Sequence, residues 1–258
     1  MNHSFIDKYS NLDSPLHEID PRAKIIAVFS CILIIVSEPP GVAFPFIFYG
    51  IIIFILVMIS RIPLIYIFKR CLIVFPFIFM AALFYPVSSL IGQEGKGFSF
   101  YQYEFRVGLT ILLKAFITFI LLILLTSTEK FHNLLHGLRK LKMPRLLGVI
   151  SALMYRYVFI LHDEMLRTNR ARDSRTPGKL KISRLKVYGN QTALIFIRSL
   201  ERSEMIYNSM LSRGFKGEFP NMQNLSLRRK DLIYSAFFIF LVLSIRLTNR
   251  IIHCYLFN

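Results

Sequence analysis

The sequence predicts an all-α fold, that of a polytopic membrane protein with about five transmembrane helices and a basic section of amphipathic helices. Two observations support this prediction. Of the 258 residues, 54% are hydrophobic, yet the chain has a formal net charge of +17, and soluble domains rarely combine these properties. The hydrophobic residues also form runs on both sides of one basic section, as expected when the runs cross a membrane.

The N-terminal membrane region, residues 1–127, is predicted to contain four spans. Asp20 and Pro21 are expected to begin the first helix, because Asp is a favoured N-cap and Pro suits the first helical position. The first span is short for a bilayer, so Arg22 and Lys24 are expected to extend toward the lipid headgroups. The four apolar runs cover residues 25–37, 42–60, 71–91 and 107–127.

The basic section, residues 128–231, is predicted to be cytoplasmic. It holds 21 of the 32 Lys and Arg residues but 8 of the 15 Asp and Glu residues, so its formal net charge is +13. Basic segments stay on the cytoplasmic side, and four spans return the chain to the side of its N-terminus. We therefore expect a multi-pass protein of the cell (inner) membrane with a cytoplasmic N-terminus. Residues 232–258 are predicted to supply the last transmembrane helix and a short tail.

Two long helices are predicted in the basic section. The first covers residues 145–175 and is followed by the stop signal Thr-Pro-Gly. In the second, residues 193–213, apolar residues recur mostly at three- and four-residue steps, and Gly214 is placed to end the helix in a left-handed conformation. Arg213 is then expected to project from the end of a rigid helix, where orphan carbonyls favour a cation. A surface helix with a basic C-terminus is the alternative interpretation of this stretch alone.

The sequence contains no Walker lysine loop, GxSxG or HExxH motif, so the chain is predicted to be non-catalytic and to have no cofactor of its own. The interiors of the spans carry no Asp or Glu, which argues against a self-sufficient ion-coupled carrier. His132 and His136 are four residues apart and share a helix face, but no third metal ligand is evident. A free N-terminus at Met1-Asn2-His3 is the other candidate, and no metal site is predicted.

Three segments of the chain resemble one family. They are DPRAKI at 20–25, YRYVFILHDEMLRTNRARDSR at 155–175 and RSLERSEMIYNSMLSRGFKG at 198–217. They are similar to the transmembrane coupling (T) component of energy-coupling-factor (ECF) ABC transporters, in the branch of CbiQ-type cobalt transport proteins. The resemblance covers almost the whole chain. It implies that the two long helices are coupling helices that dock on two cytoplasmic ATPase subunits, which bind the ATP. It also implies that the spans hold a membrane-embedded substrate-binding subunit.

The resemblance places the docking residues in two tripeptides. The first is Ala171-Arg172-Asp173 and the second is Ser212-Arg213-Gly214, where the family pattern is Ala-Arg-Gly. Ser212 is a small change from Ala. Asp173 puts a negative charge beside Arg172 and removes a glycine terminator. The first tripeptide, which forms the tip of the first long helix, is therefore expected to end differently or to dock less tightly.

The cargo implied by the resemblance is cobalt, or nickel, taken up with the help of the partner subunits. A shared T component that serves vitamin-binding subunits is one alternative. An integral membrane enzyme acting on lipid and a membrane scaffold without transport are the others. The basic charge follows the membrane topology and suits the lipid bilayer, and no nucleic-acid motif is present, so no nucleic-acid partner is expected.

Overall fold

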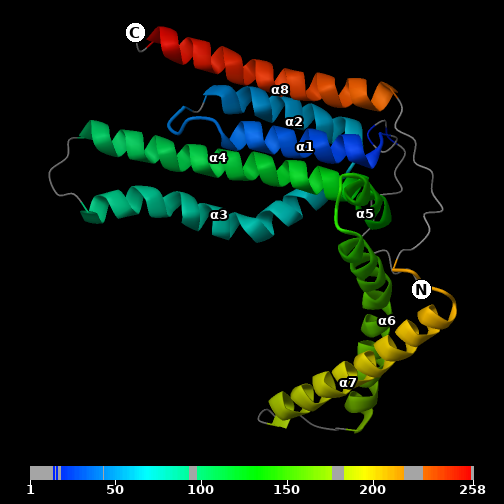
Figure 1. Ribbon diagram of the computed structural model, residues 1–258. Helices are drawn as coiled ribbons and strands as arrows, with labels where there is room; N and C mark the ends of the chain where they lie inside the picture. Colours follow the sequence, from blue (N-terminus) through cyan, green and yellow to red (C-terminus); the bar gives the residue numbers. More distant parts are fainter. Residues whose placement is uncertain are drawn as a thin grey trace. The chain divides into compact units, whose positions relative to one another are not determined.

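The computed structural model describes residues 14, 16, 19–42, 44–92, 98–175, 183–217 and 229–256. Every regular element in these ranges is a helix, which confirms the all-α prediction (Figure 1). The helices are α1 (Pro21–Val36), α2 (Phe44–Ser60), α3 (Leu64–Gly92), α4 (Phe98–Thr128), α5 (Phe131–Lys140), α6 (Arg145–Arg175), α7 (Ser183–Ser212) and α8 (Arg229–Leu256).

The chain divides into two compact units. Residues 2–137 and 225–258 form the first, which we call the membrane unit, and residues 138–224 form the second, which contains α6 and α7. In the membrane unit α4 packs against α3, α1 and α2, and α8 packs against α1 and α2 (Figure 1). Its core is apolar and includes Cys31, Ile35, Tyr49 and Leu121.

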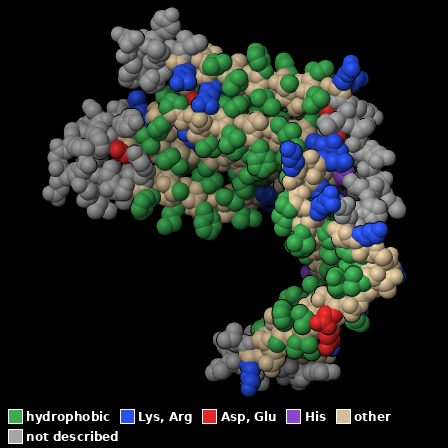
Figure 2. Space-filling model, viewed as in Figure 1, with side chains coloured by type: hydrophobic (Ala, Val, Ile, Leu, Met, Phe, Trp, Pro, Cys, Tyr) green, Lys and Arg blue, Asp and Glu red, His purple; other side chains and the backbone are tan. Residues whose placement is uncertain are grey.

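Large hydrophobic side chains also cover the outside of the membrane unit (Figure 2). Leu33, Phe77, Met80 and Phe84 each expose at least 70% of their surface. Exposed apolar surface of this extent is unfavourable in water and is expected for helices that contact lipid.

Helix length and composition support a polytopic membrane protein. In the described ranges, the helical segments Leu64–Phe84, Glu104–Thr128 and Arg229–Arg250 are long and apolar enough to span, and Phe44–Ser60 is a shorter apolar helix. These segments overlap four of the predicted spans. By the same criteria Arg145–Ser174 of α6 also qualifies, although the sequence analysis places it in the cytoplasmic section. Helix α1, with 16 residues, is about 24 Å long, shorter than a hydrocarbon core of about 30 Å.

The start of α1 is as predicted, but the surroundings of its two cations, Arg22 and Lys24, are not. The Asp20 side chain caps the helix by accepting a hydrogen bond from the Arg22 N–H at 2.9 Å, and Pro21 is the first helical residue. The expected extension of Arg22 and Lys24 toward the headgroups is wrong. Their side chains are 16% and 7% exposed, because each finds a carboxylate within the protein.

Lys24 forms an ion pair with Glu129, which lies between α4 and α5. The Glu129 side chain is only 3% exposed, so both charges have left water. Burial lowers the pKa of Lys24 and raises that of Glu129, and the attraction between the two charges opposes both shifts. The pair therefore ties the first turn of α1 to the chain that leads into α5.

We expect Lys24→Met to destabilise the membrane unit strongly, because it leaves the Glu129 carboxylate buried without its partner. Breaking a buried pair in this way costs about 3–5 kcal/mol. Thermal unfolding of the purified protein in detergent measures the loss. Lys130→Met is the matched control, since Lys130 is the exposed neighbour of Glu129. Equal melting temperatures for the two variants would contradict the structural importance of the pair.

A second prediction concerns the topology of α6. Arg156 and Asp163 lie near its middle, where each charge costs about 2.5–3.5 kcal/mol in a bilayer, so we expect α6 to stay on the cytoplasmic side. Single cysteines replacing Lys142 and Ser174, in a chain without its native cysteines, should both be labelled from the cytoplasm only. A reporter fused after Asn258 should lie outside. Labelling of positions 142 and 174 from opposite sides would mean that α6 spans the membrane.

Candidate functional site

The end of α7 is built by a left-handed glycine, as predicted. Gly214 has φ +75°, and its N–H donates to the Leu211 carbonyl at 2.9 Å. The next N–H, from Phe215, donates to the Met210 carbonyl at 3.0 Å. These two hydrogen bonds form a Schellman motif, which satisfies carbonyls that a helix end otherwise leaves unpaired. The helix therefore ends at a fixed residue, and Arg213 occupies the C-cap.

The second predicted tripeptide, Ser212-Arg213-Gly214, is exposed at all three positions. Among the residues that the structure describes, the Arg213 guanidinium has no hydrogen-bond or ion-pair partner. A guanidinium in this state keeps two edges that can each make a bidentate contact with a carboxylate. The tip of α7 thus presents an available cation on a backbone that its own hydrogen bonds hold in place.

The first predicted tripeptide, Ala171-Arg172-Asp173, lies inside α6, which continues to Arg175. Ala171 and Asp173 are exposed, but the Arg172 side chain is only 22% exposed. Its Nε and Nη2 donate to Oδ1 of Asp173 at 3.0 and 2.8 Å. This hydrogen bond to Asp173 raises the pKa of Arg172, so the side chain stays charged with its counter-ion beside it.

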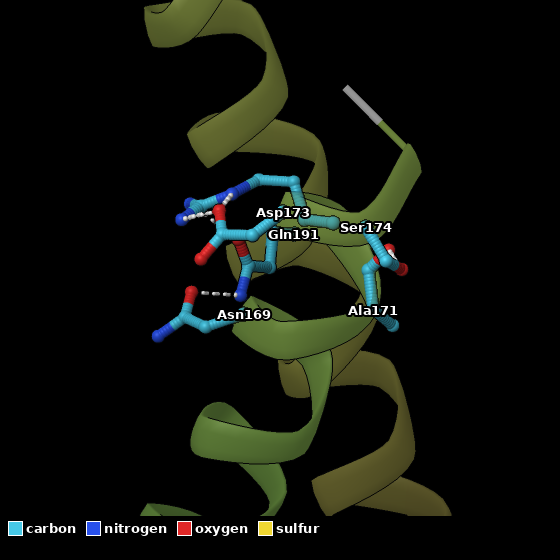
Figure 3. A network of polar contacts seen from close by, with 6 residues as sticks. Asn169, Ala171, Asp173, Ser174 and Gln191 are labelled. Atoms are coloured by element: carbon cyan, nitrogen blue, oxygen red, sulfur yellow. Dashed lines mark hydrogen bonds and ion pairs between the residues drawn. The ribbon is translucent and has the colours of Figure 1, made fainter. Parts of the chain in front are cut away.

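Arg172 also contacts α7. Its Nη1 donates to Oε1 of Gln191 at 3.2 Å, and its guanidinium carbon lies 4.6 Å from the centre of the Tyr188 ring. Gln191 is buried and donates its Nε2 to Oδ1 of Asn169 at 2.7 Å, so both ends of its amide are satisfied (Figure 3). Asn169 and Arg172 on α6 are thus joined through one amide of α7.

Helices α6 and α7 cross each other (Figure 1), and a second set of contacts joins them. Glu164 accepts hydrogen bonds from Arg198 and Arg202, each at 3.2 Å. Glu164 precedes Arg172 on α6, whereas Arg198 and Arg202 follow Gln191 on α7. The two helices therefore run in opposite directions. Arg213 follows Gln191 by 22 positions along α7, which corresponds to about 33 Å of helix. The contact of Arg172 with α7 is consequently separated from Arg213 by most of the length of α7.

A polar cluster in the membrane unit was not predicted. The buried Glu38 carboxylate, in the turn after α1, accepts hydrogen bonds from Tyr49 at 2.8 Å and from Asn249 at 3.1 Å. Lys114, which lies within the predicted fourth span at 107–127, donates to the carbonyls of Glu38 and Val36 at 2.6 and 3.1 Å. These contacts satisfy the carbonyls at the C-terminal end of α1 and make Lys114 a helix-packing residue.

The two histidines of α5 have different surroundings. His132 is exposed, whereas His136 is 5% exposed. Within the described part of the chain, no group of three or more His, Cys, Asp or Glu residues is placed to hold a metal ion. Residues 1–3 lie outside the described residues.

The site that the structure presents is a pair of arginine positions, Arg172 and Arg213. It also contains three residues that were not predicted from the sequence: Asn169, Tyr188 and Gln191.

The family model described as a cobalt transport protein, CbiQ, matches residues 13–225. The chain is 26% identical to an uncharacterised protein of Methanocaldococcus jannaschii, with 95% of this chain and 87% of that protein covered. It is 25% identical to the energy-coupling factor transporter transmembrane protein EcfT of Bacillus subtilis, with 84% and 86% covered. It is also 25% identical to a protein of Methanocorpusculum labreanum named as a fused cobalt transport protein, CbiMQ, with 79% and 35% covered. The chain therefore belongs to the CbiQ cobalt transport protein family, and its relatives include transmembrane proteins of energy-coupling factor transporters.

Proposed function

We propose that this chain is the transmembrane coupling subunit of an ECF-type ABC importer and that its two arginine tripeptides dock on two cytoplasmic ATPase subunits. The observation that supports this most is the exposed Arg213 at the capped end of the 30-residue helix α7. A guanidinium fixed at a helix end is suited to a bidentate contact with a carboxylate on a partner. The family match supplies the class of complex in which such a partner occurs.

Motion of an ATPase subunit would then reach the membrane through the helices. Because the α7 backbone is hydrogen-bonded up to Phe215, a force applied at Arg213 acts on the whole helix. The contacts of Glu164 with Arg198 and Arg202 carry part of that force from α7 to α6. In this proposal ATP is bound and hydrolysed by the partners, and the chain itself is non-catalytic.

The membrane unit is proposed to bind a separate substrate-binding subunit. The exposed apolar side chains of its helices suit both a membrane partner and the lipid bilayer. The N-terminus and the α6–α7 unit are proposed to be cytoplasmic, because the charge of residues 128–231 follows the positive-inside rule.

The proposed cargo is cobalt, with nickel as the second candidate. It rests on the cobalt transport family model and on the relative named CbiMQ. A metal path needs imidazole, thiolate or carboxylate ligands, so the partner subunit is proposed to bind the ion. The alternative is a shared component that serves several substrate-binding subunits, and it is favoured by the match to EcfT over 84% of this chain.

We expect Arg213→Ala to weaken ATPase docking while leaving the chain in the membrane. Losing one charge-assisted contact costs about 1.5–3 kcal/mol, which corresponds to roughly 10- to 150-fold in affinity. Arg172→Ala should have the same effect less strongly, because Asp173 already neutralises part of its charge. The double variant should nearly abolish uptake of radiolabelled cobalt by cells that express the whole transporter.

Lys216→Ala is the control for charge alone, because Lys216 is an exposed cation beyond the tip of α7. It should transport like the wild type. A double arginine variant that also transports like the wild type would refute the docking role. Parallel uptake of nickel and of vitamins identifies the cargo. If the double arginine variant loses vitamin uptake but keeps metal uptake, the chain is a shared component that serves vitamin-binding subunits.

A further inference from the structure

Arg172 is already occupied within this chain. An arginine side chain has five N–H donors, arranged so that it can pair with a carboxylate through its Nε–Nη2 edge or its Nη1–Nη2 edge. Asp173 takes both donors of the first edge, and Gln191 accepts a hydrogen bond from Nη1, an atom of the second edge. Tyr188 covers one face of the guanidinium plane. A partner carboxylate must therefore displace Asp173 or share Nη1 with Gln191 to make a bidentate contact with Arg172.

Asp173 and the two α7 residues hold Arg172 in different ways. Asp173 is the next residue on the same helix and is 68% exposed, so it moves with Arg172 and can itself face a partner. Gln191 and Tyr188 belong to α7 and would have to separate from Arg172 when it turns outward. The amide of Gln191 is held in place by its hydrogen bond to Asn169 (Figure 3), and its oxygen accepts the hydrogen bond from Arg172.

We propose that Gln191 and Tyr188 are positioning residues that compete with the ATPase subunit for Arg172, so that docking at the α6 tip breaks the contacts of Arg172 with α7. This inference rests on the proposed docking role of Arg172. Its consequence is a difference between the tips: Arg213 is available before the partner arrives, whereas Arg172 becomes available only when its contacts with α7 break. Docking at Arg172 then requires the contacts of Arg172 with Gln191 and Tyr188 to break. Docking at Arg213 alone requires no such step.

The test isolates the first tip by working in the Arg213→Ala background. The probe is the ATPase pair that co-purifies with the wild-type chain, purified separately and titrated onto the full-length chain in nanodiscs. Gln191→Met removes the acceptor of Arg172 at nearly constant volume and leaves the charge of the tip unchanged. It should tighten binding roughly three- to tenfold, the effect of one hydrogen bond lost by the free state. Tyr188→Leu should act in the same direction.

Two further variants separate release of Arg172 from a general loosening of the helices. Arg198→Gln breaks an α6–α7 contact at Glu164 without touching Arg172, and it should leave the affinity unchanged. When Arg172 is also replaced by Ala, Gln191→Met should no longer tighten binding. A similar gain from Arg198→Gln, or a gain that persists without Arg172, would overturn the proposal.

The chain offers a direct optical readout, because it contains no tryptophan. Tyr188→Trp introduces a single indole against Arg172, and a cation over an indole is the strongest contact of this kind. Its emission should change when the ATPase pair is added, after subtraction of the ATPase signal, and should not change in the presence of Arg172→Ala. Binding that is insensitive to both Arg172 and Arg213 would refute the proposed function itself. Binding that needs Arg172 but does not tighten with Gln191→Met or Tyr188→Leu would refute only the competition.

Discussion

The left-handed conformation of Gly214 is the constraint on which the proposed role of this chain depends. It stops α7 at a fixed residue, lets the Phe215 and Gly214 N–H groups satisfy the last carbonyls, and leaves Arg213 exposed. At the corresponding position of α6 stands Asp173, and there the helix continues to Arg175. The residue that follows the arginine therefore distinguishes the two tripeptides. Before Gly214 the arginine stands at the end of its helix, and before Asp173 it lies within its helix and contacts α7.

The contacts between α6 and α7 suit the proposal that contacts between these two helices break when an ATPase subunit docks. Glu164 pairs with two arginines whose side chains are 51% and 38% exposed, and exposed ion pairs contribute only about 0–1 kcal/mol each. The buried contact is the amide of Gln191 with Asn169 and Arg172. By contrast, the membrane unit is fixed by an extended apolar core and by the buried pair of Lys24 and Glu129. The part proposed to meet the ATPases is thus held by weaker interactions than the part in the membrane.

Local patterns in the sequence predicted the features that depend on neighbouring residues. The cap of α1 at Asp20, the apolar helix Phe44–Ser60 and the glycine end of α7 follow from residues a few positions apart. Contacts between distant residues were not predictable, because no local pattern encodes them: Lys24 and Glu129 are 105 positions apart, and Arg172 and Gln191 are 19 apart. Asp173 did signal that the first tip differs, but it did not reveal that α7 holds Arg172.

The central claim is that the tip of α7 contacts an ATPase subunit, and position-specific photo-cross-linking in cells tests it most directly. A photoreactive amino acid at position 212, next to Arg213, should form a covalent adduct with an ATPase subunit identified by mass spectrometry. The same probe at position 200, an exposed residue between Gln191 and Arg213 on α7, should form no ATPase adduct. An ATPase adduct absent from position 212, or an adduct there with the substrate-binding subunit alone, would contradict the account.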